Sequence, residues 1–262
     1  MFQKFPVLLA VTVVLFASAC KKTVEEELPV VPAPTVTALS VSSGAAGDKI
    51  TITGTNFTNA SAVTFGGTAA ASFVVKDATT IEAVVGTGGS GDVVVTTPGG
   101  TAKIGGFTFF GLGTTFDVRG TISSNITWKK DFKYRLRGYV YVLSGATLTI
   151  EAGTTILSNK DSAGVLVITP DAKIIADGTA SAPIVFTSNE STKAPGDFGG
   201  LVVAGNATWN GNHIVMEGGL DTRYASFGGN NDADNSGVLR YVRIEYAGKA
   251  VNPGDEVNGL SL

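Results

Sequence analysis

A phrase of alternating apolar and small residues recurs in the second half of the chain, and it constrains the fold more than any other feature. One copy runs from residue 140 to 154, the next from 166 to 179, and a weaker third from 201 to 207. Each copy contains short alternating strands separated by a corner of small residues. A single unit of this kind cannot bury its apolar side, whereas coils stacked on one another can. The repeat therefore predicts a parallel β-helix.

The alternation within a copy assigns each side chain to one face of a strand, because residues two apart point the same way. Gly145, Gly153 and Gly178 occur where the chain must turn a corner, and residues 189–197 form an insert that should bulge from one edge. An ordinary sandwich would explain the alternation but not the repeat. In the first copy we expect Val140, Val142, Leu148 and Ile150 to point inward, and Tyr141, Thr147 and Thr149 to face solvent.

Residues 36–110 have a different texture, with short alternating segments separated by turn residues at intervals of roughly ten positions. The alternation is clearest from Lys49 to Thr53 and from Asp92 to Thr96. After Lys49–Thr53 a turn at Gly54–Asn56 leads to Phe57, an aromatic residue that can fill the space between two sheets. This part of the sequence predicts a small antiparallel sandwich.

The N-terminus has the pattern of an export signal. Lys4 precedes an apolar run from Val7 to Phe16, and small residues follow at 17–19. The run is shorter than the ~20 residues that a membrane-spanning helix needs. Cys20 comes next and is the only cysteine, so no intramolecular disulfide can form. Residues 20–35 contain several prolines and glutamates and should form an extended linker.

Residues 17–20, Ala-Ser-Ala-Cys, resemble the bacterial lipobox. The resemblance implies that residues 1–19 are a lipoprotein signal peptide and that lipid on Cys20 attaches the protein to a membrane. The acidic run at 25–27 resembles the surface-export signal of Bacteroidetes lipoproteins, which implies an outer-membrane lipoprotein facing the cell exterior. The alternative interpretations are an incidental cysteine and a solvated charged linker.

Two further resemblances concern the folded part. Residues 36–110 resemble an IPT/TIG domain through 47–57, 63–67 and Phe107, and in that family the domain often serves as a spacer. Residues 111–262 resemble the β-helix domain of Bacteroidetes surface lipoproteins through 127–128, 145–153, 182–188, 199–201 and 234–248. Together they imply an all-β chain: an immunoglobulin-like sandwich followed by a right-handed parallel β-helix. Residues 258–262 read as a new strand, so we expect an incomplete helix, either truncated or paired with a partner.

One polar loop suggests a metal site. Asp232, Asp234 and Ser236 alternate ahead of Gly237, as the first ligands of a calcium loop do. The twelfth position is Arg243 instead of the required Glu, so this is not an EF-hand. An Asx-rich turn is the alternative. Calcium is the only cofactor that the sequence suggests.

Catalytic chemistry has little support. His213 is the only histidine, so neither a zinc site nor a Ser-His-Asp triad has its ligands. Arg243 and Glu245 share one face of a strand but could equally form a simple ion pair. Convergence of Glu217 with these two would favour a polysaccharide lyase or hydrolase. The only plausible cluster consists of Glu217, Asp221, Arg240, Arg243 and Glu245.

Aromatic residues that a flat sheet could expose suggest a binding role: Trp128, Tyr139, Tyr141, Trp209, Tyr224, Tyr241 and Tyr246. Tyr139 and Tyr141 share a face at period two and could stack on sugar rings, although such residues also ladder between coils. With Arg243 and Glu245 they are the candidate ligand-binding residues. The net charge of −3 argues against a nucleic-acid partner. We therefore expect a non-enzymatic surface module that binds a glycan or another surface component, with a polysaccharide lyase or hydrolase and a purely structural envelope protein as alternatives.

Overall fold

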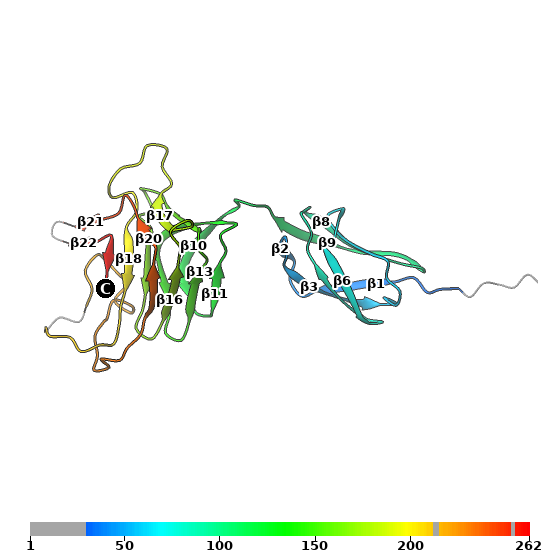
Figure 1. Ribbon diagram of the computed structural model, residues 1–262, viewed down its shortest axis with the longest axis horizontal. Helices are drawn as coiled ribbons and strands as arrows, with labels where there is room; N and C mark the ends of the chain where they lie inside the picture. The colour runs from blue at the N-terminus through cyan, green and yellow to red at the C-terminus, as the bar shows by residue number, and fades with distance from the viewer. Residues whose placement is uncertain (1–29, 212–214, 253–254) are drawn as a thin grey trace, which may run out of the picture.

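The computed structural model describes residues 30–211, 215–252 and 255–262, which form two β domains placed end to end (Figure 1). The expected signal peptide, Cys20 and the acidic run lie outside the described residues. Within the described ranges no helix is long and apolar enough to span a membrane. The all-β prediction is confirmed for both domains.

The N-terminal domain is a sandwich of two sheets. The first sheet has the order β1 (Thr35–Leu39), β3 (Lys49–Thr55), β7 (Thr80–Val84) and β6 (Ser72–Asp77). The second has the order β2 (Ser43–Ala45), β9 (Gly100–Phe110), β8 (Gly91–Thr97), β4 (Ala62–Phe65) and β5 (Thr68–Ala69). Phe57 is fully buried between the sheets with Phe65 and Phe107, as the sequence predicts. Asn56 precedes it in the left-handed conformation that Asn tolerates, with φ of 57°.

The C-terminal domain is a parallel β-helix. Its larger sheet contains β10 (Thr115–Ile122), β12 (Lys133–Val142), β14 (Thr155–Ser158), β15 (Val165–Ile168), β17 (Ile184–Ser188), β18 (Gly200–Val203), β20 (Val242–Ile244) and β23 (Leu260–Ser261). A second sheet contains β11 (Ile126–Trp128), β13 (Thr147–Ile150), β16 (Lys173–Asp177) and β19 (Gly237–Arg240). A short hairpin, β21 (Lys249–Asn252) and β22 (Asp255–Val257), lies between β20 and β23.

The larger sheet bends because the long strand β12 has Gly138 at a φ of 78°. Residues 133–136 pair with β14, and residues 139–142 pair with β15. The helix therefore has three faces. Face A contains the first part of β12 with β14, β17 and β20; face B contains the second part of β12 with β15, β18 and β23; face C is the second sheet.

Apolar side chains stack inside the helix in register from coil to coil. Val140, Leu166 and Leu201 are aligned on face B, and Leu148 and Ile174 on face C. All five have almost no exposed area, and burial of each contributes about 1.5–3 kcal/mol. The predicted inward set, Val140, Val142, Leu148 and Ile150, is confirmed.

The expectation that Tyr141 faces solvent is wrong. Its side chain points outward from face B, but only 6% of its surface is exposed. Neighbouring outward residues on this face are apolar and buried as well: Val165, Val167 and Val202. Residues 204–236, which join β18 to β19 and are here called the insert, cover this face with Met216, Leu220, Tyr224 and Ala225. An apolar outer face needs such a cover, because exposing it to water is unfavourable.

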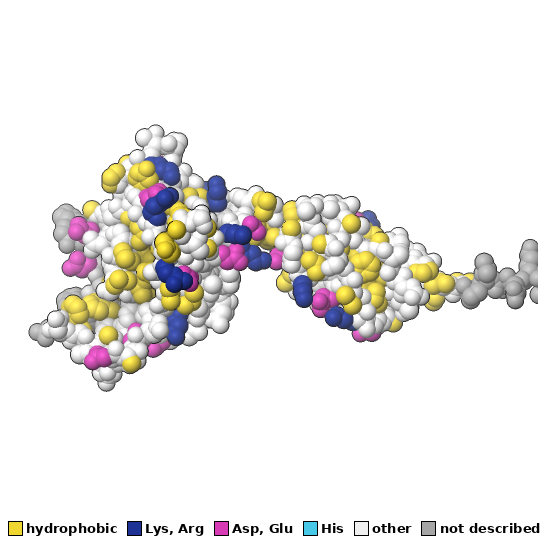
Figure 2. All heavy atoms as spheres, in the orientation of Figure 1, with side chains coloured by type: hydrophobic (Ala, Val, Ile, Leu, Met, Phe, Trp, Pro, Cys, Tyr) yellow, Lys and Arg dark blue, Asp and Glu magenta, His cyan; other side chains and the backbone are white. Residues whose placement is uncertain are grey.

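The two domains meet through an aromatic cluster. Phe110, at the end of β9, packs edge-to-face on Phe116 at 4.9 Å between ring centroids, and Phe116 packs on Phe132 at 5.2 Å. Lys129 Nζ lies 2.6 Å from Asp48 Oδ1 across the junction, where basic and acidic side chains gather (Figure 2). The N-terminal domain therefore covers the first coil of the β-helix through apolar and polar contacts.

The loop at residues 189–197, a segment distinct from the insert, bulges from the edge of the β-helix as predicted (Figure 1). It returns to the core at Asp197, whose buried carboxylate accepts hydrogen bonds from Ser188 Oγ at 2.7 Å and from the Ala194 N–H at 2.8 Å. The bonds from Ala194 and Ser188 hold the pKa of Asp197 below its usual value. The buried Asp197 therefore anchors the end of this loop to the β-helix.

Candidate functional site

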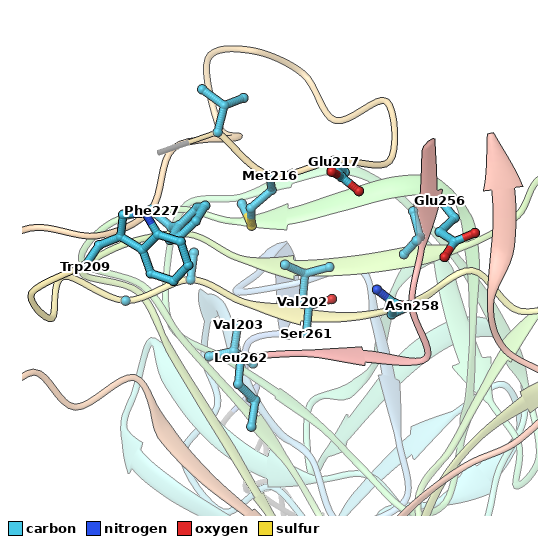
Figure 3. Close-up of a pocket in the computed structure, with 14 residues that line it drawn as sticks. Val202, Val203, Trp209, Met216, Glu217, Phe227, Glu256, Asn258, Ser261 and Leu262 are labelled. Carbon is cyan, nitrogen blue, oxygen red and sulfur yellow. The ribbon is translucent and has the colours of Figure 1, made fainter. Parts of the chain in front are cut away.

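A groove of about 400 Å³ lies between the insert and the outer side of β18 and β23 (Figure 3). Trp209 and Phe227 occupy one end, and Glu256 and Asn258 lie toward the other. Met216 lines the groove from the insert. Most ligand sites are concave and apolar with a few polar groups that set orientation, and this groove has that composition.

Trp209 is held in place yet accessible. Its indole ring meets Phe227 nearly edge-on, with 5.2 Å between ring centroids and an interplanar angle of 76°. Gly211 and Gly228 leave room for it, since a Cβ on Gly211 would lie 2.6 Å from Trp209 Nε1 and one on Gly228 would lie 3.1 Å from Trp209 Cβ. Even so, 45% of the Trp209 surface remains exposed. The ring is therefore a fixed apolar surface beside the groove.

Hydrogen bonds join the two ends of the insert, residues 206–208 and 232–236, which together form its neck. The Thr208 N–H donates to Asp232 Oδ1 at 2.9 Å, and the Asn206 N–H donates to Asp234 Oδ2 at 3.1 Å. Ser236 Oγ donates to the same Asp234 oxygen at 3.2 Å. The bonds from Thr208 lower the pKa of Asp232. These bonds hold the start of the insert, which leads directly to Trp209, against its end.

These contacts bear on the predicted calcium site. The structure does bring Asp232, Asp234 and Ser236 to one place, the neck of the insert, and gives their oxygens hydrogen-bond partners there. In the parts of the chain that the structure describes, no group of three or more His, Cys, Asp and Glu residues could hold a metal ion. Calcium binding stays a prediction, while closure of the insert is observed.

The two tyrosines of β12 fasten the middle of the insert. Tyr139 donates a hydrogen bond to the Gly218 carbonyl oxygen, and the Tyr141 hydroxyl accepts one from the Asp221 N–H at 2.9 Å. Tyr224 packs on Tyr141 with 4.8 Å between ring centroids. Burial raises the pKa of Tyr141 above its usual value. The aromatic face expected to meet a sugar is thus occupied by the insert itself.

The other predicted pair lies elsewhere. Arg243 lies in β20 and Glu245 directly follows that strand on the same side, as expected, and the two form an ion pair with 2.6 Å between Arg243 Nε and Glu245 Oε1. Thr187 Oγ1 also donates to Glu245, at 2.8 Å. This pair lies on face A, whereas Glu217 lines the groove on face B. No hydrogen bond or ion pair among the described residues joins Glu217 to either one, so the convergence that would mark a catalytic cluster is not seen.

In the sequence, Trp209 and Glu217 were two of many candidates, and no pattern pointed to the other lining residues Met216, Phe227, Glu256 and Asn258. One signal was available. Residues 165–168, Val-Leu-Val-Ile, form a continuous apolar run, which is typical of a strand buried on both sides. That pattern indicates a cover over face B, and a cover creates an edge where a groove can form.

The fold and groove define a class: a two-domain, all-β protein in which an immunoglobulin-like sandwich precedes a parallel β-helix. The chain belongs to the family described as "Pectate-lyase like beta helix domain", whose model matches residues 120–262. The IPT/TIG domain model matches residues 34–123, which confirms the character of the first domain.

Among solved structures, the chain is similar to "SGBP-B from a complex xyloglucan utilization locus in Bacteroides uniformis", with 24% sequence identity and a TM-score of 0.27. The match covers 28% of this chain and 22% of that chain, so it spans about a fifth of the length of the solved protein. No curated protein matches this sequence.

Proposed function

We propose that this protein binds a carbohydrate chain in the groove between the insert and face B, and that binding is its function. The observation that carries the proposal is Trp209, an accessible indole fixed beside a groove whose other lining groups include carboxylates and an amide. A pyranose ring offers an apolar C–H face and hydroxyl groups, and an aromatic ring beside polar acceptors is complementary to both.

The packing of the indole supports this function. An aromatic side chain that is already held loses little conformational freedom when a ligand arrives, which favours affinity. Phe227 and the two glycines hold Trp209 in the unliganded protein. Glu217 and Asn258 line the same groove, where their oxygens are suited to accept hydrogen bonds from sugar hydroxyls.

We further propose that the protein is an outer-membrane lipoprotein, attached through lipid on Cys20 and facing the cell exterior, with the IPT/TIG domain as a spacer. The arrangement of the described residues supports this. The described chain begins at the sandwich end of the molecule, and β18, which lines the groove, is at the opposite end (Figure 1). A lipid anchor ahead of Val30 would leave the groove away from the membrane.

The test is calorimetric titration of the purified protein with oligosaccharides of defined composition. Trp209→Ala should abolish binding of whichever oligosaccharide the wild type binds, because the stacking surface is removed. Tyr241→Ala is the matched control, since Tyr241 is an exposed aromatic residue that does not line the groove. Equal affinity in the wild type and Trp209→Ala would refute the proposal.

A second function, cleavage of a polysaccharide, is favoured by one observation: two carboxylates, Glu217 and Glu256, line the same groove. Glycosidases use two such groups, one as an acid and one as a base or nucleophile. Reducing ends or unsaturated products released by the wild type, and lost in Glu217→Gln while binding persists, would establish this function. Binding without any product would leave the protein a binding module.

A further inference from the structure

The charge of the groove is one-sided. Among the described residues, the only ionisable side chains that line it are those of Glu217 and Glu256, and no Lys or Arg lines it. The remaining polar side chains, Asn258 and Ser261 among them, are uncharged. Neither glutamate takes part in any ion pair of the described residues.

The arginines on neighbouring segments do not offset this charge, because each is paired within its own surroundings. Arg223 binds Asp221 on the insert, and the hydrogen bonds and charge of Arg223 lower the pKa of Asp221 to about 2. Arg240 binds Asp177 with 2.6 Å between Arg240 Nε and Asp177 Oδ1. A cleft lined by one sign of charge repels ligands of the same sign.

We infer that the groove selects uncharged polysaccharides and excludes polyuronates, a conclusion that rests on the proposed carbohydrate-binding function. Each uronate residue of a pectate chain would bring a carboxylate toward Glu217 and Glu256, and such like-charge contacts disfavour a ligand. A neutral chain instead brings hydroxyl donors, which the same two carboxylates accept. Glu217 and Glu256 thus attract uncharged glycans through hydrogen bonds and repel polyuronates through their charge.

The family description names pectate lyases, and pectate is a polyuronate. The inferred preference for uncharged chains therefore differs from what that description suggests. The family shares the β-helix scaffold, whereas the groove residues determine which ligand is accepted. Here the two glutamates come from the insert and from β22, outside the stacked coils of the scaffold. The overall charge of −3 acts in the same direction.

A basic peptide is the other ligand that an acidic, aromatic groove could attract. The groove favours a glycan because only two carboxylate side chains line it, so most of the cationic side chains of such a peptide would have no partner there. The interior, by contrast, is formed by apolar groups such as Val202, Met216 and Phe227, which suit an uncharged ring face. The peptide is therefore an outcome of the test.

The experiment is a calorimetric titration with uncharged hexasaccharides built from glucose, mannose, xylose or galactose, with hexagalacturonate, and with a hexalysine peptide. Each titration is carried out at low and high salt, with EDTA and again with calcium. The variants are Glu217→Gln, Glu256→Gln and the double variant. Glu82→Gln is the control, because Glu82 is a glutamate of β7 in the sandwich domain, outside the groove.

The wild type should bind at least one uncharged hexasaccharide and bind hexagalacturonate at least about tenfold more weakly. The difference between these two affinities should be smaller in the double variant. It should also be smaller at high salt, which screens the charges of Glu217 and Glu256. Glu82→Gln should leave it unchanged.

Three results would overturn the inference. The first is that hexagalacturonate binds as tightly as the uncharged hexasaccharide, with or without calcium, and the second is that the difference between these affinities persists in the double variant. The third is that hexalysine binds more tightly than the uncharged hexasaccharide. The first two would leave the proposed function intact. If no saccharide binds the wild type, the proposed function itself fails.

Discussion

Tyr141→Phe tests whether the insert is docked on face B, which is the condition for the groove to exist. The change removes one oxygen from a side chain that is 6% exposed and leaves the ring contacts with Tyr139 and Tyr224 in place. The oxygen that is lost accepts the Asp221 N–H at 2.9 Å. No other acceptor for this N–H exists among the described contacts.

The expected cost follows from that one bond. A typical hydrogen bond contributes about 1 kcal/mol net, and an N–H left without a partner costs about 1–3 kcal/mol when buried. Because Asp221 is only half-buried, water can partly replace the acceptor, and we expect about 1 kcal/mol. For a chain of this size that corresponds to a fall in melting temperature of roughly 2–4 °C. Tyr141→Ala, which also removes the ring, should cost about 3–5 kcal/mol.

Urea unfolding measures the loss, and hydrogen exchange at the Asp221 amide locates it. Tyr246→Phe is the matched control, since Tyr246 is exposed and should change stability by less than about 0.5 kcal/mol. If Tyr141→Phe behaves like this control and exchange at Asp221 does not accelerate, the insert is not docked as described and the groove loses its wall.

Three further predictions concern other parts of the molecule. Raising the pH above 10.0, the usual tyrosine pKa, should destabilise the fold, because burial raises the pKa of Tyr134 and Tyr141 and these tyrosines therefore ionise first in the unfolded chain. Urea unfolding between pH 9 and 11 should show a declining free energy of unfolding, and Tyr134→Phe should make the decline smaller. A free energy of unfolding that stays constant over this range would contradict the prediction. Gly237→Ala should prevent folding or lower the free energy of unfolding by several kcal/mol, because the new Cβ would lie 1.8 Å from the Ile174 carbonyl oxygen and the backbone φ is 124°. The control Gly145→Ala, where φ is 81° and no atom lies within 4 Å of the new Cβ, should lower it by only about 1–2 kcal/mol in urea unfolding. Equal losses in the two variants would contradict this prediction. Phe116→Ala should lower the free energy of unfolding by up to about 3 kcal/mol and increase proteolysis between the domains. Unchanged proteolysis would mean that the aromatic junction does not hold the domains together.

The regular part of the fold could be predicted because its residues carry a local pattern. Alternation from Lys49 to Thr53 predicts a strand that the structure contains as β3, and the repeated phrase predicts the coils and their inward residues. Phe57 was predicted to lie between two sheets because a turn delivers it there. Each of these inferences depends on neighbours in sequence or on a repeat.

The covering of face B could not be predicted by the same means. Beyond residue 207 the insert has no repeat and no alternation, so nothing local indicates where it packs. Tyr141 was expected to face solvent because strand alternation fixes only the side of the sheet, not what lies beyond it. The apolar run at 165–168 did indicate burial on both sides.

The candidate site combines residues that only the folded chain brings together. Trp209 and Phe227 come from opposite ends of the insert, and Glu256 and Asn258 come from the segment around β22 and β23. No spacing in the sequence relates them. Arg243 and Glu245 are two residues apart, and the expectation that they share a face is confirmed for that reason.

The most direct measurement of the central claim uses the two tryptophans of the chain. Trp128 is 1% exposed in the β-helix core, and Trp209 is 45% exposed beside the groove, so acrylamide should quench mainly Trp209. A saturating oligosaccharide, identified by calorimetry, should protect Trp209 from acrylamide, and the effect should vanish in Trp209→Phe. Unchanged quenching with the oligosaccharide bound would mean that the ligand binds elsewhere and would contradict the assignment of the groove.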